Sequence, residues 1–204
     1  MENNIIKTRL YLVRHGESQN YLDDRNAGQW DVDLTTNGFE QIKKLAERLK
    51  NENIYAIISS DLKRAKKSAE IIAFFHKLEV ISFKEFREIN IGEWEGMKFS
   101  DIFARSPELK FLKKDPDDLM EFRIPGGESF HELGNRVIKK FEKILKEMKG
   151  KNFLIVAHKL VNQFIISHTL GLKLKFFSRI EQDFGCLNLI DYFDDSPIVQ
   201  LING

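Results

Sequence analysis

LYLVRHGES, residues 10–18, is the most informative stretch of this chain. Its apolar half, residues 10–13, ends abruptly at Arg14, His15 and Gly16. A short apolar run that stops at such residues is typical of a buried strand in a parallel sheet. Packing gives no reason to place a guanidinium and an imidazole there, so we interpret Arg14 and His15 as functional. Glycine has no Cβ, so we expect the backbone at Gly16 to approach a ligand closely.

Strand and helix patterns alternate beyond this stretch. Further strands are predicted at residues 54–58, 80–83, 153–157, 186–192 and 197–201, the last two joined by a turn at 194–196. Helices are predicted after a cap at Thr35 or Thr36, after residue 60, between the capping box Ser129–Glu132 and Gly150, and up to Gly171. This alternation predicts an α/β fold, a three-layer sandwich with a mostly parallel central sheet and helices on both faces.

Residues 84–128 interrupt the alternation. Three prolines and a Gly126–Gly127 pair predict an irregular segment. We therefore expect one domain over residues 1–204, with a cap inserted at about 97–128. The aromatic residues of the cap are expected to form a small core beneath it rather than a nucleobase-binding surface; they include Phe99, Phe103, Phe111 and Phe122.

The composition narrows the class of protein. The chain has 204 residues, of which 42% are hydrophobic and 31% charged, and its net charge is +1. These values exclude a disordered chain and argue against binding to nucleic acid or a membrane surface through bulk charge. The single cysteine, Cys186, excludes an intrachain disulfide and favours a reducing compartment. The N-terminus resembles no signal peptide and no apolar run is long enough to span a bilayer, so we expect a cytoplasmic protein.

Polar groups that suit phosphate follow three of the predicted strands. Arg14 and His15 follow the first strand, Arg64 lies just beyond the second, and His158 ends the strand at 153–157. The carboxyl ends of parallel strands form the ligand-binding edge of an open sheet. Guanidinium and imidazole groups match the oxygens of a phosphate or carboxylate, and no nucleophile elbow for acyl transfer occurs. The pattern therefore indicates phosphoryl chemistry.

Six segments resemble, in order, the motifs of the histidine phosphatase superfamily, the phosphoglycerate-mutase-like enzymes. The resemblance covers residues 10 to about 170. The segments are LVRHGES (12–18), LTTNGFEQ (34–41), SSDLKRA (59–65), EINIGEWEG (88–96), PGGES (125–129) and VAH (156–158). The segment at 88–96 is similar to the phosphatase branch, which includes α-ribazole phosphatase-like enzymes.

The resemblance implies a role for five residues. His15, as a neutral imidazole, would attack phosphorus and become phosphohistidine. Arg14, Arg64 and His158 would hold the equatorial phosphate oxygens. Glu88 would protonate the leaving oxygen and then activate the hydrolytic water. The resemblance implies neither a metal nor any other cofactor, because the arginines supply the positive charge.

The chain departs from the family pattern around the phosphate. Tyr21 occupies the position that usually holds an asparagine, and Asn20 lies one place earlier. Lys159 follows His158 where glycine is common, so it either adds a cation to the pocket or points away from it. We expect Asn20, Tyr21, Gly28 and Lys159 to bind substrate.

Other residues compete with these assignments. We expect structural roles for His76, His131 and His168, the last on the apolar face of its helix. Glu17 is a second candidate acid, or else it orients its loop. Only the register of the motif distinguishes Glu88 from the neighbouring glutamates.

The resemblance implies a metal-independent phosphomonoesterase that acts on a small phosphorylated metabolite. A phosphoglycerate mutase, which returns the phosphoryl group to another oxygen, is the first alternative. An adapter that binds a phosphorylated ligand without turnover is the second. The oligomeric state, monomer or homodimer, stays open.

Overall fold

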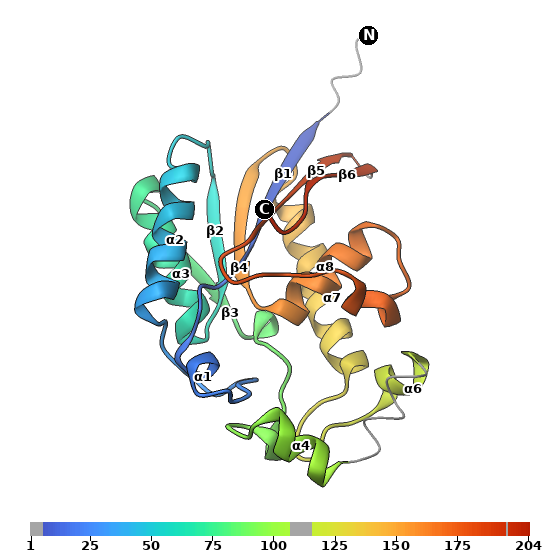
Figure 1. The fold of residues 1–204 in the computed structure, drawn as a ribbon. Coiled ribbons are helices and arrows are strands. Elements are labelled where there is room, and N and C mark those ends of the chain that lie inside the picture. Colours follow the sequence, from blue (N-terminus) through green and yellow to red (C-terminus); the bar gives the residue numbers. More distant parts are fainter. Residues whose placement is uncertain (1–5, 107–115, 195) are drawn as a thin grey trace.

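The computed structural model describes residues 6–106, 116–194 and 196–204 (Figure 1). Within these residues, six strands form one sheet in the order β3-β2-β4-β1-β5-β6. The strands are β1 (Lys7–Arg14), β2 (Ala56–Ser60), β3 (Val80–Phe83), β4 (Asn152–Ala157), β5 (Leu187–Phe193) and β6 (Ser196–Leu201). The first four are mutually parallel, β5 is antiparallel to β1, and β6 is antiparallel to β5. The predicted mostly parallel sheet is confirmed.

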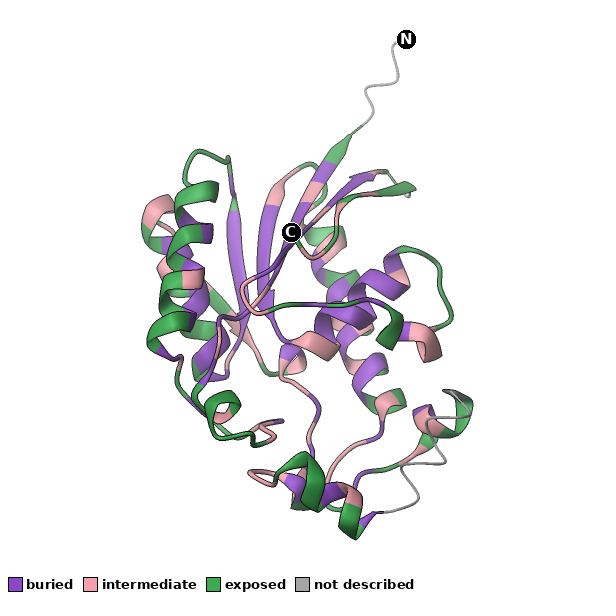
Figure 2. Cartoon of the chain, in the orientation of Figure 1, coloured by how far each residue is buried: buried purple, intermediate pink, exposed green. Residues whose placement is uncertain are grey.

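Helices cover both faces of this sheet (Figure 1). One face packs against α2 (Thr36–Leu49) and α3 (Lys63–His76), and the other packs against α7 (Phe130–Glu147) and α8 (Lys159–Thr169). Successive side chains of β1 point to opposite faces, so Leu12 belongs to the core under α7 and α8, and Val13 to the core under α2 and α3. Figure 2 shows the central strands buried along their length. The expected three-layer sandwich is therefore present.

The helix starts follow from local side-chain chemistry. The Thr35 hydroxyl accepts from the N–H of Gly38 at 2.9 Å and caps α2. Ser129 and Glu132 form the predicted capping box of α7. Such caps satisfy N–H groups that have no partner within the helix. Gly150, just beyond α7, has a φ of 78° and turns the chain into β4.

The segment predicted to be irregular contains short helices, which corrects that prediction. They are η1 (Lys84–Phe86), η2 (Gly92–Trp94), α4 (Phe99–Arg105) and α6 (Pro116–Glu121). Helices of seven residues or fewer carry too little periodicity to stand out in a sequence. Figure 1 shows α4 and α6 at one end of the molecule, beyond the sheet. Phe111 of the cap and Asp195 of the last turn lie outside the described residues.

Two other short elements lie next to the candidate site. They are α1 (Gln19–Leu22), which follows β1, and η3 (Leu174–Arg179), which precedes β5. Among the described helices, none is both long and apolar enough to cross a membrane.

Candidate active site

The ends of β1 and β4 bring two histidines together. Arg14 is paired with Ala157 in the register of these parallel strands, and the N–H of His15 donates to the Ala157 carbonyl at 3.0 Å. The rings of His15 and His158 therefore lie edge to face, with their centroids 5.0 Å apart. Both side chains are buried, and His15 is 5% exposed.

Gly16 is required for packing and not for the approach of a ligand. A Cβ at this position would lie 2.3 Å from the carbonyl oxygen of Gly38, in the first turn of α2. A Cβ on Gly38 would in turn lie 2.0 Å from the carbonyl oxygen of Glu17. The expectation that a ligand approaches the backbone at Gly16 is therefore wrong, because helix α2 occupies that space.

The hydrogen bond of His15 defines its tautomer. Nδ1 lies 2.7 Å from the carbonyl oxygen of Gly16. A carbonyl can only accept, so Nδ1 carries the proton and Nε2 of the neutral ring keeps its lone pair. Burial and the charges of Arg64 and Arg14 hold the pKa of His15 well below its ordinary value of 6.5. The ring is therefore neutral at neutral pH, with a free lone pair on Nε2.

His158 is the second imidazole of the site. It is fully buried, and neither ring nitrogen has a hydrogen-bond partner among the described residues. Burial and the charge of Arg64 hold its pKa well below 6.5. A buried polar group without a partner costs stability, which is acceptable where a ligand completes its hydrogen bonds.

Arg14 is held by a carbonyl and an aromatic ring. Its Nη1 donates to the carbonyl of Gln182 at 2.7 Å, and its guanidinium lies 3.7 Å from the centre of the Phe184 ring. Its Nε is buried and has no partner among the described residues. Burial lowers the pKa of Arg14. One N–H of an oriented guanidinium is therefore left for an anion.

Arg64 is fixed by the loop at residues 27–30. Its Nη1 donates to the carbonyl of Trp30 at 2.8 Å, and its Nη2 donates to that of Gly28 at 2.7 Å. The carboxylate of Glu95 accepts from three consecutive N–H groups of the same loop, those of Gly28, Gln29 and Trp30. Burial lowers the pKa of Arg64 to about 10, and the nearby carboxylate of Glu88 opposes this effect. Arg64 is cationic at neutral pH.

Glu88 stands in the wall of the site. Its Oε1 accepts from the N–H of Ile89 at 3.0 Å, and its Oε2 accepts from the N–H of Leu160, in the first turn of α8, at 3.2 Å. Burial raises the pKa of Glu88 above its ordinary value of 4.5, although both N–H groups and both arginines oppose the shift. A carboxyl group with a raised pKa is suited to donate a proton.

A cavity of about 540 Å³ opens beside these groups. Arg14 and Glu88 line it, together with all four predicted substrate-binding residues, Asn20, Tyr21, Gly28 and Lys159. His15, Arg64 and His158 are buried behind this lining. The structure thus places the five predicted catalytic residues and the four predicted substrate-binding residues in or beside one cavity, whereas Glu17, the second candidate acid, does not line it.

The polar candidates in this lining already have protein partners. Asn20 accepts from the Ser18 hydroxyl at 2.8 Å and donates to the carbonyl of Arg25 at 2.8 Å. Lys159 forms an ion pair with Glu181, which also lines the cavity. Lys159 therefore contributes a cation that a neighbouring carboxylate balances. Glu17 accepts from the Thr35 hydroxyl at 2.7 Å, so it orients its loop.

The arrangement provides the groups that phosphoryl transfer requires: a neutral nitrogen with a free lone pair, two guanidiniums, a second imidazole and a protonatable carboxyl group. A model of the histidine phosphatase superfamily (branch 1) matches residues 10–204. The chain belongs to this superfamily. The resemblance seen in the sequence is confirmed.

Known members of the superfamily differ in the activity that their names state. Probable phosphoglycerate mutase GpmB of Serratia proteamaculans is 37% identical over 164 residues, which are 80% of this chain and 75% of that protein. The structure of a putative α-ribazole-5′-P phosphatase from Escherichia coli has a TM-score of 0.88 at 26% identity and covers 97% of this chain and 96% of that one. A phosphoserine phosphatase from Entamoeba histolytica, in complex with 3-phosphoglyceric acid, has a TM-score of 0.83 at 25% identity, with 97% of each chain covered.

Three residues of this superfamily member support the site without having been nominated from the sequence. Phe184 lies against the rings of His15 and Tyr21 as well as over Arg14. Its place follows from the antiparallel pairing of β5 with β1, which brings the residues before β5 beside the end of β1. Glu95 holds the loop at 27–30. Arg136 donates to the carbonyl of Glu88 at 3.0 Å from α7. Of these three, only Phe184 could have been anticipated, and only once the pairing of β5 with β1 was known.

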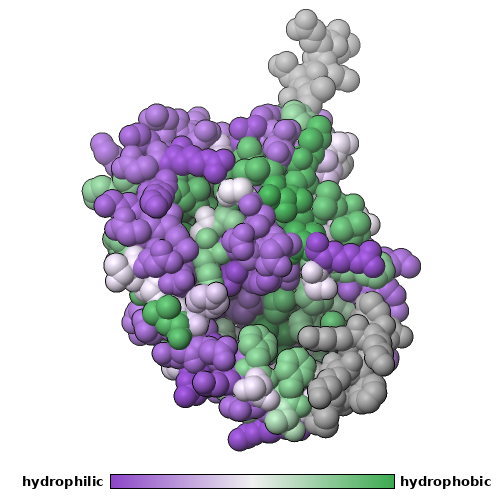
Figure 3. Space-filling view, in the orientation of Figure 1, coloured by the Kyte–Doolittle hydropathy of each residue, from purple (hydrophilic) through white to green (hydrophobic). Residues whose placement is uncertain are grey.

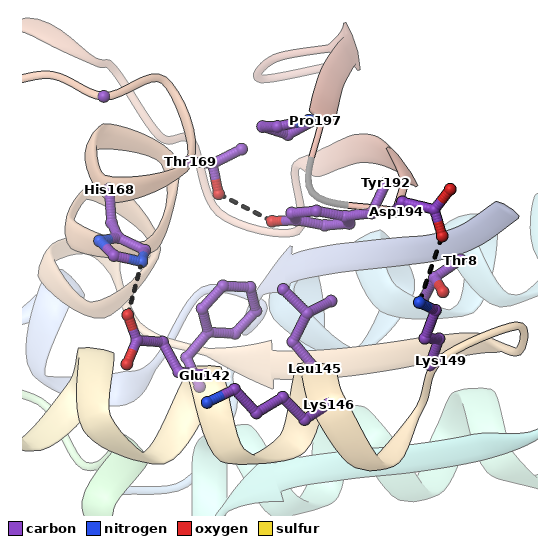
Figure 4. Close-up of a pocket in the computed structure, with 12 residues that line it drawn as sticks. Thr8, Glu142, Leu145, Lys146, Lys149, His168, Thr169, Tyr192, Asp194 and Pro197 are labelled. Carbon is purple, nitrogen blue, oxygen red and sulfur yellow. Dashed lines mark hydrogen bonds and ion pairs between the residues drawn. The ribbon is translucent and has the colours of Figure 1, made fainter. Parts of the chain in front are cut away.

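A second cavity of about 430 Å³ lies at the other end of α8, between α7 and the β5–β6 hairpin (Figure 4). His168 lines it and lies 3.2 Å from the carboxylate of Glu142. Its side chain is 36% exposed. The expectation of a core histidine at 168 is therefore wrong, because α7 leaves this side of the last turn of α8 open. This cavity contains none of the residues nominated for the phosphoryl site.

Proposed function

We propose that this member of the histidine phosphatase superfamily is a phosphomonoesterase that acts through a phosphohistidine on His15. The tautomer of His15 carries the proposal. With Nδ1 donating to the Gly16 carbonyl, the lone pair of Nε2 is free to attack, and two cationic arginines lie nearby. The substrate is a small phosphorylated molecule bound in the cavity lined by Arg14, Glu88 and Tyr21.

The first step transfers the phosphoryl group to the enzyme. Nε2 of His15 attacks phosphorus in line, the bond from phosphorus to the leaving oxygen breaks, and the proton of Glu88 passes to that oxygen to give the free alcohol. Arg14, Arg64 and His158 donate to the equatorial oxygens as the charge redistributes. The Gly16 carbonyl stabilises the positive charge that develops on the imidazole ring.

The second step returns the enzyme to its starting state. The Glu88 carboxylate takes a proton from water, the water oxygen attacks phosphorus, and the bond from Nε2 to phosphorus breaks. Inorganic phosphate leaves with His15 neutral and Glu88 protonated again. These arginines supply the positive charge that a metal ion supplies in other phosphoryl-transfer enzymes, so we propose that neither step requires a metal.

Mutase activity is the second candidate, and the relatives named as probable phosphoglycerate mutases favour it. A mutase must keep water from the phosphohistidine, whereas a phosphatase must admit it. Glu88 is only partly buried in the wall of an open cavity, which supports access of water.

Phosphate release separates the two candidates. The protein is incubated in excess EDTA with nitrophenyl phosphate, glycerol phosphate, phosphoserine, α-ribazole phosphate and 3-phosphoglycerate. We expect inorganic phosphate from several esters and no change in the position of the phosphate on 3-phosphoglycerate. Rapid exchange between its 2- and 3-positions, with little phosphate released, would establish the mutase instead.

The pH dependence of kcat/KM should reflect the two shifted pKa values. His15 must be neutral, and its lowered pKa keeps it neutral well below pH 6.5. Glu88 must be protonated to act as an acid, and its raised pKa extends the protonated form above pH 4.5. We therefore expect an acidic optimum and a decline as the pH rises through the pKa of Glu88.

This decline should be steeper for glycerol phosphate than for nitrophenyl phosphate, because nitrophenolate leaves without a proton. Each profile is corrected for the second ionisation of the ester itself, near pH 6. Equal alkaline declines for both esters would contradict a role for Glu88 as the acid.

A further inference from the structure

A cavity of about 380 Å³ lies under the cap, and its chemistry differs from that of the phosphate site. Among the described residues that line it, Asn26 alone is polar. Two stacked aromatic pairs form much of its wall, Trp94 with Phe122 and Phe130 with Phe177. The volume falls within the range of small-molecule sites.

This apolar cavity adjoins the phosphate cavity. The two share Asn26, Ile89, Ile91, Phe99 and Leu160 in their linings. The two cavities therefore lie side by side, with charged groups in the lining of one and apolar side chains in the lining of the other. Figure 3 shows apolar side chains at the surface over α4, which bears Phe99.

Glu88 stands at the junction of the two cavities. The N–H groups of Ile89 and Leu160 hold its two carboxylate oxygens, and the side chains of the same two residues line the apolar cavity. With Glu88 as the proposed acid, the leaving oxygen lies beside it, and the carbon atoms attached to that oxygen can extend into the neighbouring apolar cavity. Among the described residues of this lining, charged parts of a leaving group would find only Asn26 as a polar partner.

We infer that the natural substrate is a phosphomonoester whose leaving alcohol carries an aromatic or branched apolar body, and that this body occupies the cavity under the cap. The inference rests on the proposed function, since it takes Glu88 as the acid at the leaving oxygen. Phe99 is 60% exposed and lines both cavities, so its ring is accessible to an apolar group bound there.

Non-hydrolysable ligands test the inference whether or not the protein turns over an ester. Binding of 3-phenylpropylphosphonate and of propylphosphonate is measured by calorimetry on the full chain. The two share the phosphonate and the three-carbon chain and differ only in the phenyl group. We expect the phenyl compound to bind roughly 10- to 100-fold more tightly, as burial of a phenylalanine-sized group supplies. Equal dissociation constants would overturn the inference.

Two exposed phenylalanines provide a matched pair of variants. Phe99→Ala should reduce the ratio of the two affinities several-fold, because it removes part of the rim of the apolar cavity. Phe74→Ala removes a phenylalanine that is 80% exposed on α3 and lines neither cavity, so it should leave the ratio unchanged. An equal effect of both variants on the ratio would also contradict the inference.

Hydrolysis of the corresponding phosphates distinguishes the two proposals. We expect kcat/KM for 3-phenylpropyl phosphate to exceed that for glycerol phosphate by roughly 10- to 100-fold. If phosphate is released without this preference, the proposed phosphatase activity stands and the proposed apolar subsite is refuted. If 3-phenylpropylphosphonate binds tightly but no ester releases phosphate, the apolar subsite stands and the proposed phosphatase activity is refuted.

Discussion

Replacing His15 by alanine is expected to reduce the rate of phosphate release by at least about 10⁴-fold, the scale seen when an enzymatic nucleophile is removed. In the proposed mechanism Nε2 of His15 bonds to phosphorus, whereas the neighbouring imidazole, that of His158, binds an equatorial oxygen and does not attack. The measurement is kcat for nitrophenyl phosphate in excess EDTA. A second readout is radiolabel retained on the protein after rapid quenching in base, which preserves phosphohistidine.

His168→Ala is the matched control for this variant. His168 pairs with Glu142 at the far end of α8 and lines a separate cavity, so its removal should change kcat by no more than about twofold, as is usual for surface substitutions. If His15→Ala kept most of the wild-type rate, or if both variants lost the same amount, the phosphohistidine mechanism would be wrong. If the wild-type chain released no phosphate but His15→Ala still bound phosphonates, the adapter would replace the enzyme as the best account.

Replacing Glu88 by glutamine is expected to lower kcat/KM for glycerol phosphate by about 10²- to 10⁴-fold, the usual contribution of general acid catalysis. Glutamine keeps the shape of the side chain but has no acidic proton for the leaving oxygen. For nitrophenyl phosphate, kcat/KM should change little, because nitrophenolate is a stable anion. The variant also lacks the base for the second step, so nitrophenolate should appear in a burst while phosphohistidine accumulates.

Glu93→Gln serves as the control for Glu88→Gln. Glu93 belongs to the same segment but is exposed and lies outside the lining of the phosphate cavity. It should therefore preserve kcat/KM for both esters. Equal losses of kcat/KM for glycerol phosphate and nitrophenyl phosphate in Glu88→Gln would refute Glu88 as the acid. A loss of kcat/KM for glycerol phosphate in Glu93→Gln would indicate Glu93 as the acid instead.

The sequence predicts best where a local rule determines the outcome. The caps at Thr35 and Ser129 depend on side chains within four residues, and both helices begin where expected. The gathering of Arg14, His15 and His158 follows from parallel strands that end at one edge. In each case, short-range chemistry and one topological rule are sufficient.

Long-range packing explains what the sequence did not reveal. Position 16 requires glycine because α2 packs directly against its backbone. This contact could not be known before the helix was placed. His168 has apolar spacing on α8, yet its side chain is 36% exposed because the neighbouring helix does not cover it. Phe184 reaches Arg14 only through the antiparallel return of β5. Each depends on a partner that is distant in sequence.

The loop at residues 27–30 is linked both to Arg64 and, through the preceding Asn26, to the start of the cap. Its carbonyls hold Arg64, and just before it Asn26 exchanges backbone hydrogen bonds of 2.9 Å with Gly96 and Met97, at the base of the cap. The loop and Asn26 therefore connect Arg64, the cation proposed to bind phosphate, to the segment that leads into α4. Such coupling is reciprocal: if one position of the cap strengthens binding of the phosphoryl group, then binding of the phosphoryl group stabilises that position of the cap by the same free energy. We therefore expect substitutions in the cap to change the affinity for every phosphate ester as well as the choice of alcohol.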